Sequence, residues 1–432
     1  MASALDEPKK PQPPGSSVGR LLGVLSDKSY DFYKNPVQYF DKNAADFKSR
    51  VFQSRFLFKP TVFVGSNQGL ADVMSDGGEF TELGYKTFMG QIYGDNILFT
   101  DGKPAEKLRD ALSQLFTDDC VKTYQQTIDR IVEKEILNLD ISKPVCLYEF
   151  YKKMVTEICL SLFLGLDFED TSDVYDTITS LTTTHWHGII SVPLALKIPG
   201  TGKESSFKQA LQAKDKLLEV IKERRETSKK GFHQKLEEIH ELDEEAINNH
   251  LLLFTSALVP KALASLLTSF SLEVGQNQKV SWQKMCLLDE EFMEQMLLEV
   301  QRYYPPFLGG RRVVTKDFEV DGYNIPAGHS IVYLTFAAHR DPSIFENPNQ
   351  FYPGRWKNST SDTQKKKLFC FGYLSRGCVG ERLVWAIVKT ILTSLLKKFE
   401  LSLIDNQDLS YKWLPVSRPK TDVLFKFTSR PS

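Results

Sequence analysis

The sequence predicts a mainly α-helical fold with a minor β portion. Apolar residues recur at helical spacing in the segments 105–119, 121–138 and 147–165. The segment 243–272 is almost continuously apolar, which predicts one long helix that is buried on most of its sides. Strand-like alternation is confined to short stretches, so the outline is mostly helical.

The N-terminal part predicts a lead-in followed by a hairpin. Residues 1–18 are rich in Pro, Gly and Ser, and we expect a flexible lead-in there and one large domain over 19–432. The stretch VFQSRFLFKPTVFVG at 51–65 is rich in β-branched and aromatic residues, contains a Lys-Pro turn signal, and predicts a β-hairpin. Farther along, segment 206–230 predicts a charged amphipathic helix.

The C-terminal part combines helices with short strands. Residues 288–303 predict a helix that ends before a Tyr-Pro-Pro stretch. The alternation and glycine turns in DFEVDGYNIPAGHSIVYLTF predict a small sheet. A loop-rich stretch, 340–378, precedes a final long helix, 379–399, and the tail, 400–432, carries strand-like pieces.

Composition and charge exclude several classes of protein. The hydrophobic content of 41% and the charged content of 25% are ordinary for a soluble globular protein. A net charge of −1 gives no basis for nucleic acid or an anionic membrane as the main partner. The 29 phenylalanines fit a large apolar interior or a pocket for an apolar ligand.

Hydropathy also bears on location. We find no signal peptide and no uninterrupted apolar run of about 20 residues, the length that spans a bilayer. We therefore expect a soluble, cytoplasmic protein without a transmembrane segment, and peripheral membrane contact stays open.

The cysteines do not form a recognisable metal or disulfide framework. They are scattered, and no CxxC pair occurs, which argues against a structural zinc site. A reducing compartment is expected, so disulfides are not. The six positions are Cys120, Cys146, Cys159, Cys286, Cys370 and Cys378.

Cys378 lies in FGYLSRGCVG, directly before the predicted final helix. The dipole and free amides of a helix N-terminus stabilise a thiolate. Gly377 and Gly380 leave room for a flat group beside the backbone, and Arg376 supplies a positive charge. These residue types suit an axial haem ligand with the arginine on a propionate. A buried structural cysteine explains the same residues, so this stretch alone leaves both interpretations open.

A second set of residues decides between them. In EVQRYYPP, Glu299 and Arg302 lie on one helix face, where they can form an ion pair. Arg355 follows in FYPGRW. The order is ExxR, PP, a small β unit, FxPxRW, FxxxxRxCxG and a long helix. This ordered set resembles the cytochrome P-450 superfamily of haem-thiolate enzymes, over nearly the whole chain and most strongly from Glu299 to Gly380.

The resemblance implies a P-450 fold in a single large haem domain that binds haem b. Cys378 would be the axial thiolate ligand and the iron-binding residue. A buried ion cluster would hold the cysteine loop, a geometric role because buried pairs add little net stability. Its members would be Glu299, Arg302 and Arg355. The haem propionates would be bound by Arg109, Arg312 and Arg376.

Two positions near this site depart from the family pattern. Ala105 replaces the tryptophan often found four residues before the first propionate arginine. Leu374 replaces a glycine that usually lets the cysteine loop turn close to the haem, so the turn must be made with a bulkier side chain.

The distal helix departs further. The segment 243–272 resembles the central helix of the family, where O₂-activating members carry an acid–alcohol pair because O–O cleavage requires delivered protons. Here these positions fall near Leu258, Val259 and Pro260, and neither a carboxylate nor a threonine is present. Pro260 would break the helical hydrogen bonds and allow a kink. Lys261 is expected to face solvent or a loop, with a distal catalytic lysine as the alternative.

A haem thiolate without a proton relay suits a substrate that already contains an O–O bond. Thr255 and Ser256 lie about a turn early, and hydroxyls in helices usually bond their own backbone. We therefore expect the fatty-acid hydroperoxide branch of the superfamily, which SYDFYKNPVQYFDKNAADFKSRVFQSR and DGKPAEKLRD also resemble. Such an enzyme needs neither O₂ nor a redox partner. An epoxyalcohol synthase is favoured over an allene oxide synthase or hydroperoxide lyase, because apolar Leu258 and Val259 on the catalytic face would stabilise no cation.

Two other functions stay open. GGRRVVTKDFEVDGYNIPAGHSIVY and RGCVGERLVWAIVK are also similar to retinoid- and sterol-oxidising families, which favours an O₂- and reductase-dependent monooxygenase of a fatty acid, retinoid or sterol. The distal helix without polar groups also allows an inactive haem- or lipid-binding protein.

Apolar burial would bind the lipid substrate. The expected pocket residues are Phe88, Ile92, Ile97, Phe99, Phe307 and Leu414. His185 and His187, in HWHG, are a candidate metal pair, but a loop or helix end is the preferred interpretation because no cysteine or acid is nearby. His339 is expected either near the haem or in a structural role.

Overall fold

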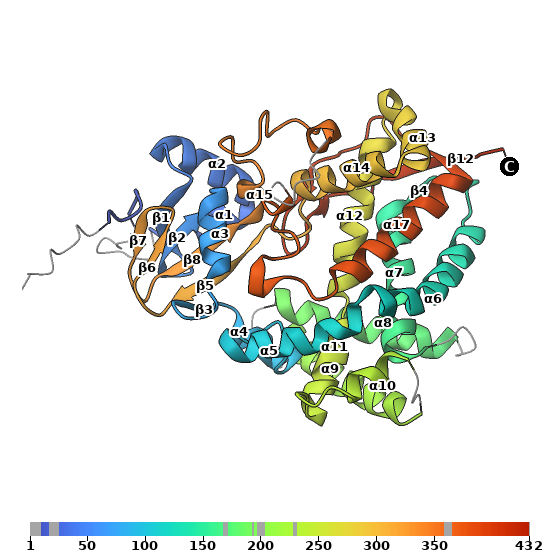
Figure 1. The fold of residues 1–432 in the computed structure, drawn as a ribbon, viewed down its shortest axis with the longest axis horizontal. Coiled ribbons are helices and arrows are strands. Elements are labelled where there is room, and N and C mark those ends of the chain that lie inside the picture. The colour runs from blue at the N-terminus through green and yellow to red at the C-terminus, as the bar shows by residue number, and fades with distance from the viewer. Residues whose placement is uncertain are drawn as a thin grey trace, which may run out of the picture. The chain divides into compact units, whose positions relative to one another are not determined.

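The structure is a computed structural model (Figure 1). Its internal contacts divide the chain into two compact units. Unit 1 comprises Met1–Tyr85, Phe307–Phe351 and Ser361–Gly377. Unit 2 comprises Lys86–Pro306, Tyr352–Thr360 and Cys378–Ser432. The described residues are 10–16, 26–166, 172–191, 194–196, 204–227, 231–357 and 365–431.

Unit 1 is built on a five-stranded sheet. Its strands, in spatial order, are β1 (Val51–Phe56), β2 (Lys59–Val64), β8 (Ser330–Leu334), β5 (Gly309–Val314) and β3 (Thr81–Leu83). β1 and β2 pair antiparallel, β2 and β8 pair parallel with Thr61 opposite Ser330, and β8, β5 and β3 continue antiparallel. The buried face carries β-branched residues such as Val62, Val64 and Ile331, as expected for strands that pack on a core.

The predicted hairpin at 51–65 is confirmed, but its turn lies elsewhere. Leu57 and Phe58 form the turn, both with positive φ, whereas Lys59 and Pro60 belong to β2. The predicted sheet over the DFEVDGYNIPAGHSIVYLTF stretch is divided. β6 (Phe318–Val320) and β7 (Tyr323–Ile325) form a separate two-stranded hairpin, and β8 joins the five-stranded sheet instead.

Short helices complete unit 1. They are α1 (Ser29–Lys34), α2 (Pro36–Phe47), α3 (Asn67–Ser75), α15 (Thr335–Ala338) and the 3₁₀ turn η5 (Leu374–Arg376). α3 begins where the Ser66 side chain accepts a hydrogen bond from the Gly69 N–H, an N-cap that satisfies a free helical donor. Within the predicted lead-in, the carbonyls of Pro11 and Pro14 accept hydrogen bonds from Asn324 and Gln53, so this part is held against the strands of the unit.

Unit 2 is mainly helical (Figure 1). Its longer helices are α4 (Lys86–Tyr93), α5 (Gly102–Ser113), α6 (Asp118–Leu137), α7 (Leu147–Leu164), α8 (Ser172–His187), α9 (Ser206–Thr227), α11 (Glu244–Thr255), α12 (Leu258–Val274), α13 (Val280–Leu288), α14 (Glu290–Tyr303) and α17 (Glu381–Lys398). Shorter ones are α10 (Phe232–Glu237), η1 (Gln114–Phe116), η2 (Gly188–Ile190), η3 (Asn277–Lys279) and η4 (Pro353–Trp356). The predictions for 105–119, 121–138, 147–165, 206–230, 288–303 and 379–399 correspond to α5, α6, α7, α9, α14 and α17.

Helix signals in the sequence explain these positions. α17 buries Leu383, Ile387, Ile391 and Leu395, which recur every four residues and form one apolar stripe. α14 starts where the Asp289 side chain accepts from the Phe292 N–H at 3.2 Å. The mainly helical fold class with a minor β portion is therefore confirmed.

Two small sheets lie near the C-terminal end of unit 2. One contains β4 (Val145–Cys146), β12 (Leu424–Ser429) and β9 (Phe399–Leu403) in that order. The other pairs β10 (Tyr411–Lys412) with β11 (Arg418–Pro419). The strand-like tail is thus confirmed. The loop between β10 and β11 carries Leu414, a predicted substrate residue, and also Val416.

One helical stretch passes a length-and-composition test for a membrane span. It is Glu244–Val274, and 83% of its most apolar window is buried within the protein. We expected no apolar segment long enough to span a bilayer, and this stretch shows that one is present. A core helix of a soluble protein passes the same test when it is mostly buried, as this one is.

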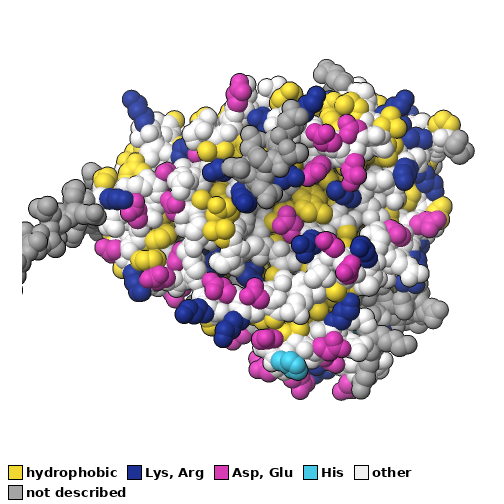
Figure 2. Space-filling view, in the orientation of Figure 1, with side chains coloured by type: hydrophobic (Ala, Val, Ile, Leu, Met, Phe, Trp, Pro, Cys, Tyr) yellow, Lys and Arg dark blue, Asp and Glu magenta, His cyan; other side chains and the backbone are white. Residues whose placement is uncertain are grey.

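The visible surface mixes positive and negative side chains. Figure 2 shows Lys and Arg interspersed with Asp and Glu over the face in view, with apolar patches between them. Such mixing is consistent with the formal net charge of −1.

Candidate functional site

Cys378 lies just before α17 in unit 2, as the sequence predicts. Its side chain is exposed. The protein around it nevertheless limits hydration and raises the pKa of the thiol, while the Gly380 N–H and the nearby Arg109 guanidinium act in the opposite direction. The structure therefore brings Arg109, on α5, close to Cys378. Ala105, one turn earlier on α5, is buried.

The loop that precedes Cys378 closes through η5 in unit 1. Gly372 has φ +78°, and a Cβ there would lie 2.2 Å from the Arg376 carbonyl oxygen, so only glycine fits. Leu374 also adopts a left-handed conformation, with φ +46°, and its side chain is 68% exposed. The expectation that this turn is made with a bulky residue is confirmed, and the leucine side chain escapes a clash by facing solvent.

The predicted ion cluster forms within unit 2. Arg302, on α14, donates two hydrogen bonds to the Glu299 carboxylate, at 2.9 and 2.8 Å, and both side chains are fully buried. The Arg355 guanidinium, in η4, lies 3.0 Å from the same carboxylate. A buried carboxylate is stable only when it is paired and hydrogen-bonded, and these contacts satisfy that condition.

Sequence reasoning missed two members of this cluster. The Tyr352 backbone N–H donates to Glu299 Oε1 at 2.8 Å, and the Trp356 indole N–H donates to Oε2 at 2.9 Å. The FxPxRW pattern contains both positions, and the tryptophan beside the arginine was the available signal. The carboxylate accepts five hydrogen bonds, two from Arg302 on its own helix and three from the segment 352–356, and these three tie η4 and the residue before it to α14.

The other two predicted propionate arginines, Arg312 and Arg376, lie in unit 1 and share a neighbouring segment. Arg312, on β5, is buried, donates to the Thr81 hydroxyl and carbonyl at 2.8 Å, and lies 4.0 Å from the Asp76 carboxylate. Arg376 donates to the Asp76 carbonyl at 3.4 Å. Asp76 also accepts from the Gly78 backbone N–H, so it organises the whole turn after α3. Asp76 belongs to no motif that sequence reasoning could recognise.

The predicted single helix over 243–272 is wrong, because the helix is interrupted. α11 ends at Thr255 and α12 begins at Leu258, and Ser256 between them is non-helical, with ψ 147°. Pro260 has no N–H and its ring would clash with the carbonyl of residue 256 in a continuous helix, which explains the position of the break. The predicted kink is therefore a full interruption.

Hydroxyl groups occupy the interruption. The Thr255 hydroxyl donates to the Leu251 carbonyl at 2.7 Å, which confirms the expected backbone bond. The Ser256 hydroxyl instead lies 2.6 Å from the Tyr93 hydroxyl, at the end of α4, and accepts from the Leu258 N–H. Burial raises the pKa of Tyr93 well above its ordinary value, so this pair consists of neutral hydroxyls.

The residues after the interruption contact an apolar group that we call the distal cluster, defined by the residues Trp186, Ala257, Val416, Ile189 and Leu258. Leu258 packs against its buried core, and Val259 is half-buried. The expectation that Lys261 faces solvent or a loop is wrong, since its Nζ is buried and lies 4.9 Å from the centre of the Trp186 ring, which belongs to helix α8.

The predicted substrate residues fall in different environments. Ile92, Ile97 and Phe99 are buried in unit 2. Leu414 is half-buried in the β10–β11 loop, and Phe307 is 37% exposed and belongs to unit 1. The side chain of the remaining one, at position 88, lies outside the described residues.

The histidines have structural contacts. His185 and His187 end α8, as the preferred interpretation predicts, and His185 is buried with Nε2 2.8 Å from the Ile92 carbonyl. His339 Nε2 accepts from the Phe369 N–H at 2.8 Å, a structural role. Among the residues that the structure describes, no group of three His, Cys, Asp or Glu side chains could hold a metal ion.

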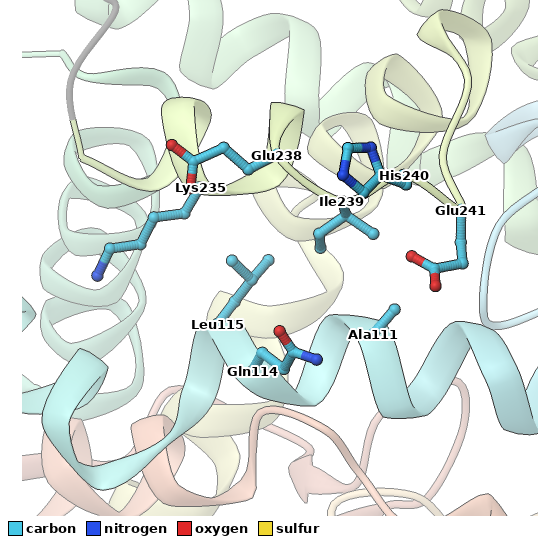
Figure 3. A pocket seen from close by; sticks show the side chains of 8 residues that line it. All are labelled: Ala111, Gln114, Leu115, Lys235, Glu238, Ile239, His240 and Glu241. Atoms are coloured by element: carbon cyan, nitrogen blue, oxygen red, sulfur yellow. The ribbon is translucent and has the colours of Figure 1, made fainter.

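A surface cleft of about 420 Å³ lies elsewhere in unit 2. Figure 3 shows it between α5 with η1, which contribute Ala111, Gln114 and Leu115, and the end of α10 with the turn that follows it. The α10 side contributes Lys235, whose Nζ lies 3.4 Å from Cys120 Sγ. None of the predicted site residues lines this cleft.

The chain resembles known proteins over nearly its full length. A family model described as Cytochrome P450 matches residues 11–257 and 252–427, so its two matched segments overlap at the interruption between α11 and α12. A curated relative, the putative cytochrome P450 120 of Synechocystis sp., is 24% identical over 454 residues and covers 97% of both chains. The β-amyrin 28-monooxygenase of Barbarea vulgaris is 22% identical, covering 90% of this chain and 86% of that protein.

A solved structure shares the fold. The retinoic acid-bound cyanobacterial CYP120A1 superposes with a TM-score of 0.82 at 22% identity, over 98% of this chain and 100% of that chain. These comparisons support the predicted superfamily. They do not support the narrower resemblance to the hydroperoxide branch, because the relatives named here are P450s of other branches.

Proposed function

Because the chain belongs to the cytochrome P450 family, a membership that implies a thiolate-ligated haem, we propose that it is a monooxygenase of a hydrophobic small molecule. One oxygen atom of O₂ enters the substrate, the other leaves as water, and a redox partner supplies the electrons. A relative is named a β-amyrin 28-monooxygenase, and a structural neighbour binds retinoic acid, which supports an apolar substrate. This replaces the hydroperoxide reaction as the preferred function.

The residues around Cys378 fit a haem thiolate. The thiol is exposed, and the Gly380 N–H and the positive charge of Arg109 favour an anionic sulfur, although burial outweighs them and raises the pKa of the free thiol. Cys378 would hold the iron, and Arg109, Arg312 and Arg376 would bind the propionates. When bound, the haem supplies the centre at which O₂ is activated.

The observation that carries the proposal is the hydroxyl pair at the interrupted distal helix. O₂ cleavage requires protons, and a carboxylate is absent from the segment 255–261. The Ser256 and Tyr93 hydroxyls, 2.6 Å apart, each donate and accept, so they can pass a proton along the break. They give this chain a polar path that sequence reasoning, aligned on Leu258 and Val259, did not find.

The surroundings of that pair suit an apolar substrate. Ile92 and Phe99 are buried beside Tyr93, and the Tyr93 and Phe99 rings lie 6.3 Å apart. In the distal cluster, Trp186 and Val416 pack with Ala257 and Leu258 at the start of α12. Binding would come mostly from burial of apolar surface, at roughly 25 cal/mol per Å².

The experiment measures turnover of purified ferric protein with retinoic acid and with lauric acid. One arm supplies O₂, NADPH and a surrogate reductase, and the other supplies a linoleate hydroperoxide without O₂ or NADPH. Product formation only in the first arm supports the proposal, and Tyr93→Phe should then lower the fraction of consumed O₂ that appears as product. Turnover only in the second arm overturns it.

The hydroperoxide isomerase is the second candidate, favoured by one observation. The positions expected for an acid–alcohol pair, Leu258, Val259 and Pro260, carry no polar side chain, and Thr255 is bonded to its own backbone. A substrate hydroperoxide would bring its own O–O bond and need no delivered proton. Loss of the conjugated-diene absorbance in the second arm tests this, and a protein inert in both arms would be a haem- or lipid-binding protein.

A further inference from the structure

Lys261 is a buried amine without an ordinary partner. It lies in the first turn of α12, and its Nζ is buried with no hydrogen-bond partner among the residues that the structure describes. The Nζ atom lies over the Trp186 ring, 4.9 Å from the ring centre. A buried ammonium normally requires a hydrogen-bonded counter-charge, because removal of its hydration is costly.

Two other lysines of unit 2 that lie over aromatic rings have an acidic partner, which Lys261 lacks among the described residues. Lys279 also lies over a tryptophan, Trp282, but its ammonium is paired with Glu273. Lys152 lies over the Tyr148 ring and is paired with a neighbouring glutamate. Each of these lysines combines an aromatic face with an acidic partner, and Lys261 has only the aromatic face.

The charges around Lys261 are mostly positive. The pKa of Lys261 is lowered to about 7, mainly by burial and also by the charges of Lys152 on α7 and Arg418 on β11, whereas the charge of Glu149 on α7 acts in the opposite direction. From α8, His187 also lies within electrostatic range. Glu149 is already paired with Lys152. The site therefore has an excess of positive charge that an anion would balance.

Next to this charge lies the apolar distal cluster. Trp186 contacts Lys261 with its ring and belongs to the cluster with Ala257 and Val416. A cation beside an apolar surface complements a molecule with an anionic head and a hydrocarbon body. A nucleotide or sugar phosphate would bury its polar body against these side chains at a cost.

We propose that the Lys261 ammonium binds the carboxylate of an amphipathic organic acid whose hydrocarbon part packs on the distal cluster. The inference rests on the proposed function, since it names the substrate class of that same site. Lys261 is thereby a specificity-determining residue that fixes one end of the substrate. The Trp186 ring contacts the ammonium on one side, and the carboxylate supplies the hydrogen-bond acceptor that the ammonium lacks.

The experiment compares two ligands of equal chain length, dodecanoate and dodecan-1-ol, by isothermal titration calorimetry with the haem-loaded full chain. At about pH 6 the ammonium form dominates, and wild type should bind dodecanoate at least about tenfold more tightly than the alcohol. Lys261→Met should remove this preference while the affinity for dodecan-1-ol is retained. Lys261→Arg should keep most of it, because the charge stays.

A lysine elsewhere provides the matched control. Lys235 also lies over an aromatic ring, that of Tyr124 at 5.7 Å, and lines the cleft in Figure 3. Lys235→Met makes the same chemical change away from the distal cluster. It should leave the preference for dodecanoate unchanged, which separates a specific effect from general loss of positive charge.

The pH arm supplies a second readout. Dodecanoate stays ionised above about pH 6, whereas the Lys261 amine of the free protein loses its proton as the pH rises through about 7. The preference of wild type should therefore fall between about pH 7 and about pH 9, by up to about tenfold per unit, and that of Lys261→Met should stay flat. The same fall in both proteins would contradict the role of Lys261.

The outcomes separate the inference from the proposed function. An undiminished preference in Lys261→Met overturns the inference, even if both proteins oxidise substrates. Binding of neither ligand by folded wild type also overturns it. A preference that depends on Lys261, in a protein that shows no O₂-dependent turnover, supports the inference and contradicts the monooxygenase.

Discussion

At the scale of single residues, the Glu299 carboxylate is the most connected group of the candidate site. It accepts from Arg302, Arg355, Tyr352 and Trp356, and removal of its charge leaves the fully buried Arg302 without its counter-ion. Glu299→Gln should lower the free energy of unfolding by about 3–5 kcal/mol, the usual cost of breaking a buried pair on one side. Urea denaturation at about 25 °C measures this change.

The same helix offers a control for that prediction. Glu290 begins α14, is 90% exposed, and lies 3.7 Å from Lys389. Glu290→Gln should change the free energy of unfolding by less than about 1 kcal/mol, since exposed ion pairs contribute little. Equal losses in the two variants would show that the carboxylate of Glu299 is not an organising centre.

Lys261 gives a second prediction at this scale, for the protein without substrate. Its pKa in the fold is about 7, below the value of 10.5 for a free lysine. Between these two values the unfolded chain holds a proton that the folded chain has lost, so the free energy of unfolding rises with pH. Below about pH 7 both states are protonated and the cost of burying the charge is fully present.

The measurement compares unfolding of wild type, Lys261→Met and Lys261→Arg from about pH 6 to about pH 10. Relative to Lys261→Met, wild type should gain stability as the pH rises. Lys261→Arg should show no such gain, because a guanidinium stays protonated over this range. Parallel curves for wild type and Lys261→Met would place the ammonium in water rather than against Trp186.

At the scale of elements, the turn before Cys378 depends on one glycine. Gly372 has φ +78°, and a Cβ there would meet the Arg376 carbonyl at 2.2 Å, whereas Gly380 has φ −91° and no atom within 4 Å of an added Cβ. Gly372→Ala should destabilise the protein by about 1–3 kcal/mol and lower its haem content. Gly380→Ala should stay within about 0.5 kcal/mol of wild type. Thermal unfolding measures the change in stability, and the haem absorbance per protein measures the haem content. Equal behaviour of the two variants would contradict the special role of Gly372 in this turn.

Helix positions were predictable from local pattern, but the interruption of the distal helix was only partly so. The apolar run over 243–272 has the composition of one helix, and composition does not report backbone continuity. Pro260 indicated that the helix is kinked or broken. The geometry of the interruption also involves Tyr93, whose hydroxyl contacts Ser256 from a helix that is far away in the sequence. Such a partner is created by the fold and has no local signature.

At the scale of the whole molecule, the same distinction explains which site residues were found. Glu299, Arg302 and Arg355 belong to motifs whose order is visible in the sequence, and the structure brings them together. Asp76 carries no motif, and its link to Arg312 arises because β3 pairs with β5 across a large sequence separation. Strand pairing between distant segments is set by the tertiary structure, so side-chain partners across it cannot be read from spacing.

The remaining prediction concerns the stability of the full chain with and without haem. A cofactor that binds only the folded state stabilises it by mass action, by about 2.7 kcal/mol at a free concentration 100 times its dissociation constant. If Cys378 is the iron ligand, haem should raise the unfolding midpoint of wild type and of Cys370→Ala, since Cys370 is a half-buried loop cysteine. Cys378→Ala should lose most of this gain and the thiolate-type absorbance, because the strongest bond to the cofactor is gone. An equal gain in all three proteins would assign the ligand to another residue, and the geometry around α17 would then have a structural purpose alone.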